Sequence, residues 1–140
     1  MNISRVALAA VAAFIAYFVL GSITFSVPAL RNEFLKYPAV YRGKEGQMSQ
    51  MPVGMVAMFL AMVALALLYA KLYRGGSGFT EGASFGALIA LFALGAFVLH
   101  NYVNLNIGLK LMLVQAVVYS VSWIVTGIVI GLIYRPLAPR

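Results

Sequence analysis

The side chains best suited to chemistry in this sequence flank one short turn, between the third and fourth of its long apolar runs. The single histidine, His100, can ligate a metal or a pigment and can exchange a proton near neutral pH. Amide and phenol side chains lie on both sides of the same turn, at Asn101, Asn104, Gln115 and Tyr119. Because the turn folds the two runs side by side, we expect these residues to converge and form a small polar pocket.

Two interpretations of this predicted pocket stay open. In the first, the polar side chains only fix helix packing, because unpaired polar groups are costly in hydrocarbon. In the second, the pocket binds a small molecule, an ion, a lipid headgroup, or a haem or chlorophyll with His100 as one axial ligand. The sequence contains no Ser/His/Asp set, no paired carboxylates and no phosphate-binding glycine loop, so we predict no catalytic residue and no enzyme. We also predict no metal site, and no cofactor can be named.

A stripe of small residues predicts how the third run packs. Gly82, Gly86, Ala90 and Ala93 recur at steps of three and four, which places them on one face of a helix. Small residues let two helix backbones approach closely in a membrane. His100 continues the same stripe, so we expect its side chain to point into the bundle and to be shielded from lipid.

Methionines recur at helical spacing in the second run, at Met48, Met51, Met55, Met58 and Met62. Thioethers bind Cu(I), and Met51-x-x-x-Met55 resembles the pattern of copper transporters. The methionine- or histidine-rich amino-terminal segment of those transporters is missing, and this chain has one apolar run too many. Methionine is also a flexible filler of apolar packing, and we favour this interpretation.

Four long apolar runs must position these residues. Of the 140 residues, 64% are hydrophobic and 9% are charged, whereas a soluble domain carries roughly 25% charged residues. A chain this short cannot bury so much apolar surface in its own core. We therefore predict an all-α, polytopic membrane protein, a bundle of four transmembrane helices in a single domain over residues 1–140. The expected spans are residues 6–27, 53–73, 79–103 and 109–134.

The segments between the spans differ in length. Spans two, three and four are joined by short turns, so we expect them to be antiparallel neighbours, with Pro52 opening span two. Residues 29–51 form the long connection, in which cations alternate with aromatic and aliphatic side chains. This mixture suits an interfacial segment in the headgroup layer, and an ordered polar loop is the equal alternative. The first run is too long for a signal peptide, so we expect an uncleaved span.

The charge balance is basic, with 10 Lys and Arg against 3 Asp and Glu. The cations flank the apolar runs, where they meet anionic lipid headgroups, and no basic face with interleaved aromatics predicts a nucleic-acid partner. They divide evenly between the two membrane sides, so the orientation depends on the amino terminus, which favours cytoplasmic termini; insertion in both orientations is the alternative. Glu33, Glu45 and Glu81 lie outside the middle of the runs, which argues against a proton-coupled transporter.

Three segments resemble small bacterial four-helix membrane proteins of unknown function: RNEFLKYPAVYR after span one, MPVGM at the opening of span two, and HNYVNLNIGLK between spans three and four. The resemblance covers most of the chain and implies a multi-pass protein of the bacterial inner (plasma) membrane. The resemblance implies no particular activity.

The function predicted from these features is that of a non-catalytic integral membrane component. The plentiful small-residue faces favour an accessory subunit of a larger membrane complex or a self-associating bundle. Its expected partners are the lipid bilayer and other membrane protein subunits or a second copy. The alternative is a small-molecule or ion carrier that uses the pocket near His100 and Gln115.

Overall fold

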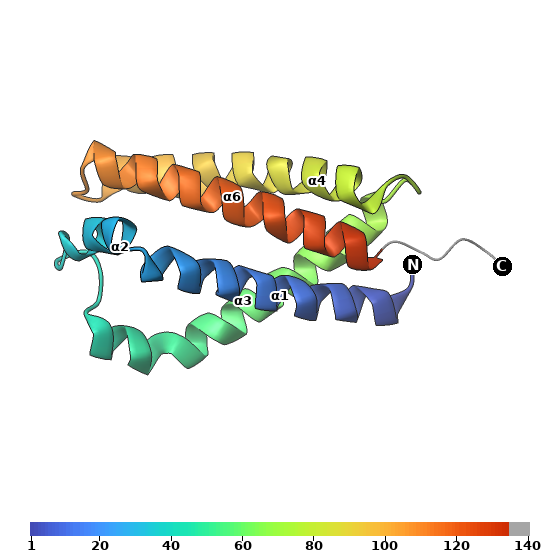
Figure 1. Ribbon diagram of the computed structural model, residues 1–140, viewed down its shortest axis with the longest axis horizontal. Helices are drawn as coiled ribbons and strands as arrows, with labels where there is room; N and C mark the ends of the chain where they lie inside the picture. Colours follow the sequence, from blue (N-terminus) through green and yellow to red (C-terminus); the bar gives the residue numbers. More distant parts are fainter. Residues whose placement is uncertain (135–140) are drawn as a thin grey trace.

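The computed structural model describes residues 1–134 as helices joined by short turns (Figure 1). The helical elements are α1 (Ile3–Ser26), α2 (Pro28–Leu35), α3 (Lys44–Leu72), α4 (Gly78–Ala93), the π-helix η1 (Leu94–Leu99), α5 (His100–Asn104) and α6 (Leu109–Tyr134). Residues 1–134 contain no strand, and four segments within them are long and apolar enough to cross a membrane: α1, α3, α4 with η1 and α5, and α6. The prediction of an all-α membrane protein with four spans is therefore confirmed.

The four spans pack in the order α3, α1, α6, α4. α4 and α6 make the most extensive contact and run antiparallel, as expected (Figure 1). α3 and α4 contact each other near their connecting turn, where Tyr69 packs on Phe85. The expectation that they are neighbours along their length is wrong, because α3 packs chiefly on α1. The turn between them allows this: Gly75 has φ 91°, and the Glu81 carboxylate accepts hydrogen bonds from the backbone N–H groups of Arg74 and Gly76.

Glycines bring the backbones of α4 and α6 close together. A Cβ added at Gly82 would lie 2.5 Å from the carbonyl oxygen of Gly127, and one at Gly86 would lie 2.6 Å from that of Trp123. Neither separation is compatible with a side chain, so only glycine fits at these crossing points. Ala90 continues the contact face and is buried, as is Ala93 one turn further along α4.

The helix α3 begins at Lys44, well before the predicted start of span two, and Pro52 lies inside it. The expectation that Pro52 opens this span is wrong. Proline removes one backbone hydrogen bond and crowds the carbonyl four residues earlier, which bends a helix without necessarily ending it. A helix entering hydrocarbon also continues because any other backbone conformation leaves polar groups unpaired. Figure 1 shows the amino-terminal half of α3 diverging from α1.

The packed core lies toward the end of the molecule that holds the amino terminus. Met62 and Ala66 of α3 are fully buried there against Ala9 and Ala13 of α1. By contrast, almost every residue of α3 from Lys44 to Leu60 is exposed. The second half of α3 therefore anchors it in the bundle, while its first half borders open space beside α1.

Candidate functional site

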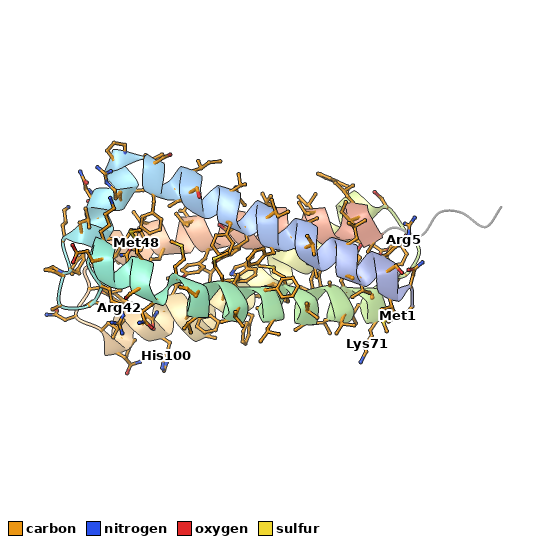
Figure 2. All side chains as sticks on the ribbon, turned by 90° about the horizontal axis from the view of Figure 1, so that it is seen from below. Met1, Arg5, Arg42, Met48, Lys71 and His100 are labelled. Carbon is orange, nitrogen blue, oxygen red and sulfur yellow. The ribbon has the colours of Figure 1, made fainter. Side chains whose placement is uncertain are left out.

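The structure turns His100 outward, so the prediction that this side chain is shielded is wrong. His100 lies at the same end of the molecule as Arg42 and Met48 (Figure 2), and it is exposed. The cause is η1, whose wider turn contains one residue more than an α-helical turn. Ala93 and Val98 are consequently buried five residues apart, and the residues that follow are shifted by one position relative to the α-helical stripe.

Two other predicted pocket residues also lie apart from Gln115. Asn104 is exposed, and its Nδ2 donates a hydrogen bond to the backbone oxygen of His100 at 2.7 Å. Asn101 is half-buried. The cavity beside Gln115 and Tyr119 is lined by neither asparagine and not by His100. The structure therefore brings together two of the five predicted residues and separates the other three from them.

A cavity of about 290 Å³ adjoins Gln115 and Tyr119 and is lined mainly by α1 and α6. It is near the lower end of the size range of ligand pockets in proteins. Its lining combines apolar surface with hydrogen-bonding side chains from four parts of the chain. The polar members are Tyr17, Thr24, Tyr41, Gln47, Gln115, Tyr119 and Ser122.

Gln115 is the most buried amide of this lining, with 4% of its surface exposed. Its Nε2 donates a hydrogen bond to the Tyr41 hydroxyl at 2.5 Å. Its Oε1 is buried and accepts no hydrogen bond from the residues that the structure describes. A buried acceptor without a partner costs about 1–3 kcal/mol. Gln115 thus has a buried, unpaired acceptor in the wall of the cavity.

Tyr41 supplies a second polar group to the same cavity, from the connection between α2 and α3. Burial raises the pKa of its phenol above the usual value, an effect that the hydrogen bond from Gln115 partly offsets. The hydroxyl is therefore protonated at neutral pH. Because its oxygen accepts from Gln115, its own proton remains available for donation to another group.

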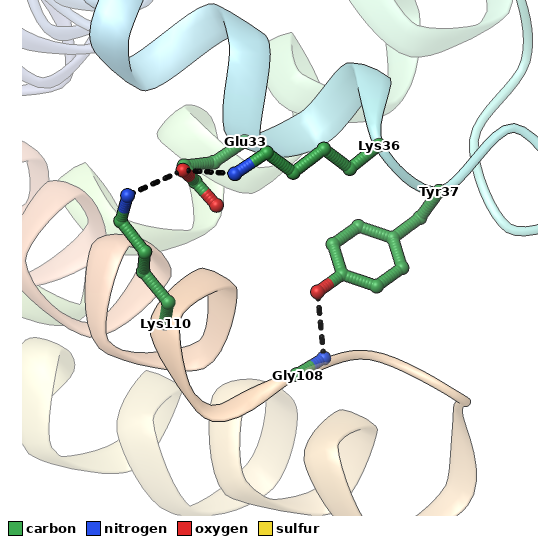
Figure 3. Close-up of polar contacts among 5 residues, drawn as sticks. All are labelled: Glu33, Lys36, Tyr37, Gly108 and Lys110. Atoms are coloured by element: carbon green, nitrogen blue, oxygen red, sulfur yellow. Dashed lines mark hydrogen bonds and ion pairs between the residues drawn. The ribbon is translucent and has the colours of Figure 1, made fainter.

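Contacts spaced four residues apart hold the long connection on the start of α6. Glu33 accepts hydrogen bonds at 2.7 Å from the ammonium groups of Lys110 and Lys36, and the Tyr37 hydroxyl accepts one at 3.0 Å from the backbone N–H of Gly108 (Figure 3). The hydrogen bond from Lys110, followed by that from Lys36, lowers the pKa of the Glu33 carboxyl. The connection is thus an ordered segment docked on α6.

Sequence reasoning missed the part of the lining that lies outside α6. Tyr17, Gly21 and Thr24 follow helical spacing on α1 and face the cavity together. The signal that was available is this spacing, with the recurrence of Glu33, Tyr37 and Tyr41 at every fourth position. The contacts of these residues with α6 depend on the overall fold, so the spacing alone does not predict them.

The methionine stripe of α3 is divided between two environments. Met62 is fully buried in the core, and Met58 is half-buried. Met51 and Met55 are exposed and border a second hollow between α1 and α3. Only the carboxyl-terminal part of the stripe therefore fills the packed core of residues 1–134.

The interpretation of this cavity depends on its own geometry and chemistry. The exposed apolar side chains around the four spans suit contact with a lipid bilayer and place the cavity within a multi-pass membrane protein. Comparisons with known protein families, with curated proteins and with solved structures give no match.

Proposed function

We propose that this protein is a non-catalytic component of the bacterial plasma membrane that holds a small amphiphilic molecule in the cavity beside Gln115. The observation that supports the proposal is a cavity of about 290 Å³ with seven hydrogen-bonding side chains in its lining. In hydrocarbon, such groups are costly unless they are paired. An occupant with both polar and apolar parts would pair them and fill the remaining space.

If these polar side chains only fixed helix packing, they would form hydrogen bonds with one another. The lining forms few such hydrogen bonds. Among residues 1–134, a single side-chain hydrogen bond joins two of the polar lining residues, from Gln115 to Tyr41. Thr24 donates instead to the backbone oxygen of Leu20 on its own helix. The Gln115 Oε1 also accepts no hydrogen bond within residues 1–134, although it is buried in the cavity wall.

The cavity supports holding a molecule better than carrying it across the membrane. Beyond the cavity, the bundle is filled by side chains that are fully buried, including Met62, Ala66 and Ala13. A passage through this core would require the helices to separate. We therefore favour a binding component over the predicted alternative of a carrier.

The substitution Gly21→Leu tests the proposal by filling the cavity. Gly21 lines it, and a Cβ at this position would have no other atom within 4 Å, so the larger side chain enters open space. We expect the variant to fold and to lose a small molecule that co-purifies with the wild-type protein, as measured by native mass spectrometry. Ala87→Leu on the exposed face of α4 is the matched control and should retain the molecule.

Wild-type protein that is gently purified from native membranes and carries no small molecule would contradict this function. Equal retention by wild type and Gly21→Leu would also contradict it, because the molecule would then bind elsewhere.

A second candidate function, that of a partner subunit, is supported by the first half of α3. From Lys44 to Leu60 nearly all residues are exposed, including the small residues Gly54 and Ala57, which permit close helix packing. The chain has no cysteine, so Ala57→Cys introduces a single thiol. We expect it to cross-link in membranes to another subunit or to a second copy, whereas Ala87→Cys on α4 should not. Absence of cross-links at Ala57 would remove this candidate.

A further inference from the structure

Three basic side chains without an acidic partner surround one hollow at the end of the molecule opposite Met1. Arg31, Arg42 and Lys44 line this hollow of about 520 Å³, and no Asp or Glu contributes to it. Within residues 1–134, the ion pairs of the long connection involve Glu33 with lysines outside this set. The three cations therefore form a site of uncompensated positive charge.

We propose that this hollow binds the phosphate of an anionic phospholipid, whose acyl chain lies in the adjoining groove between α1 and α3. The inference goes beyond the proposed function, because it assigns a second site that adjoins the cavity beside Gln115 at Tyr41 and Gln47. The phosphate accepts hydrogen bonds from the two guanidinium groups and the ammonium group. Figure 2 places Arg42 at the end of the molecule opposite Arg5 and Lys71, so the site faces a single membrane surface.

The adjoining groove has the lining that an acyl chain requires. It measures about 510 Å³ and shares Tyr41, Arg42 and Gln47 with the basic hollow. Further from the charged mouth its walls become apolar. These apolar walls are formed by Phe18, Met51, Met55 and Met58, with Gly54 leaving space between them.

The groove extends through part of the depth of one membrane leaflet. At 1.5 Å per helical residue, the distance along α3 from Met51 to Met58 is about 10 Å. The hydrocarbon depth of one leaflet is about 15 Å, half of the bilayer core. A headgroup at Arg42 would therefore place the first part of an acyl chain beside the methionines, whose flexible thioethers adapt to an irregular chain.

A free anion would use only part of this site. The basic hollow continues into apolar surface, which phosphate alone leaves unfilled and a phospholipid covers. Among residues 1–134, the hollow near the opposite end is lined by Lys71 and Arg74, but also by the carboxylate of Glu81, which offsets their charge.

The test compares two lipids with the same acyl chains, phosphatidylglycerol and phosphatidylcholine, added to the detergent-purified full chain. We expect native mass spectrometry to show preferential binding of phosphatidylglycerol and a higher unfolding temperature with that lipid. Arg31→Gln/Arg42→Gln should reduce its binding roughly thirtyfold, because two headgroup contacts of about 1 kcal/mol each are lost. The matched control, Lys71→Gln/Arg74→Gln, changes two cations at the opposite end and should retain the preference.

A second variant tests the acyl-chain part without changing any charge. A Cβ at Gly54 would have no other atom within 4 Å, so Gly54→Leu fills the groove without a clash. It should displace phosphatidylglycerol while leaving the three cations in place. Inorganic phosphate at the same concentration should neither raise the unfolding temperature nor displace the lipid.

Several results would overturn the inference. Equal binding of both lipids by the wild type, together with a retained native amphiphile, would exclude the anionic site and leave the proposed function intact. A wild-type protein that prefers phosphatidylglycerol but retains no small molecule from native membranes would overturn the proposed function alone. Stabilisation by inorganic phosphate alone would show that the hollow binds anions in general. An obligate dimer that covers the groove would show that a second copy, and not an acyl chain, occupies the groove.

Discussion

The Nε2 atom of Gln115 on α6 donates a hydrogen bond at 2.5 Å to the hydroxyl of Tyr41, which lies 74 residues earlier in the chain. This contact joins the docked connection to the cavity wall. It aligns with the contacts of Glu33 with Lys110 and of Tyr37 with Gly108, the residue before α6, so three positions spaced four apart share one docking face. The cavity and the connection are therefore parts of a single structural unit.

Tyr41→Phe should destabilise the protein by about 1–3 kcal/mol, because it leaves the buried Gln115 amide without its remaining partner. Gln115→Met in the same chain should recover most of this loss, since both polar groups are then replaced by apolar ones. The measurement is chemical unfolding in detergent of the two single variants and the double variant. Tyr102→Phe, at an exposed position, is the control. Additive losses would show that the two side chains are not coupled.

Acid should weaken the docking of the connection through Glu33. Its pKa is lowered in the folded state by Lys110 and Lys36, so the carboxylate contributes stability above its unfolded pKa of about 4.3. This contribution to stability is lost as the pH falls through the lower pKa that Glu33 has in the folded state. Unfolding temperatures measured between pH 7 and pH 3 should decline less for Glu33→Gln than for the wild type. Identical declines would contradict a stabilising role of this carboxylate.

The contact between α4 and α6 should not tolerate a side chain at Gly86. In Gly86→Leu, the Cβ would meet the Trp123 carbonyl oxygen at 2.6 Å and the Ile124 Cα at 2.8 Å, so the two backbones must separate. We expect loss of the folded bundle or a large fall in its unfolding temperature. Leu91→Ala, on a side chain that is 67% exposed, should change it little. Equal tolerance of both changes would show that the helices do not cross at Gly86.

The π-helix η1 should make the third span, formed by α4, η1 and α5, unusually tolerant of a deletion at one place. Removal of Gly95 converts the wide turn into an α-helical one and leaves Ala93 and Val98 on the same face. Removal of Ala87 from the regular part of α4 instead rotates every later residue by about 100°. The Gly95 deletion should therefore remain folded in a thermal assay, and the Ala87 deletion should not. Equal damage from both deletions would contradict this role of η1.

Some predictions from the sequence were confirmed and others were wrong, and the difference has physical reasons. Apolar runs predicted the spans because the bilayer imposes a minimum length on them. The spacing from Gly82 to Ala93 predicted a face that the structure buries, since this stretch is a regular α-helix. The same spacing failed at His100, because a π-turn intervenes and leaves no trace in residue types. Pro52 was equally ambiguous, since proline either begins a helix or bends one.

The pairing of Glu33 with Lys110 has a consequence for the biosynthesis of the protein. Lys110 is synthesised 77 positions after Glu33, which takes about 4 to 15 s at ordinary translation rates. The ion pair forms only when both side chains are on the same membrane surface, which requires an even number of crossings between them. Two completed crossings, by α3 and then by α4, meet this condition in either orientation of the chain. The connection can therefore dock on α6 only after both of these spans have crossed the membrane. If one crossing fails, Glu33 and Lys110 remain on opposite surfaces and cannot pair.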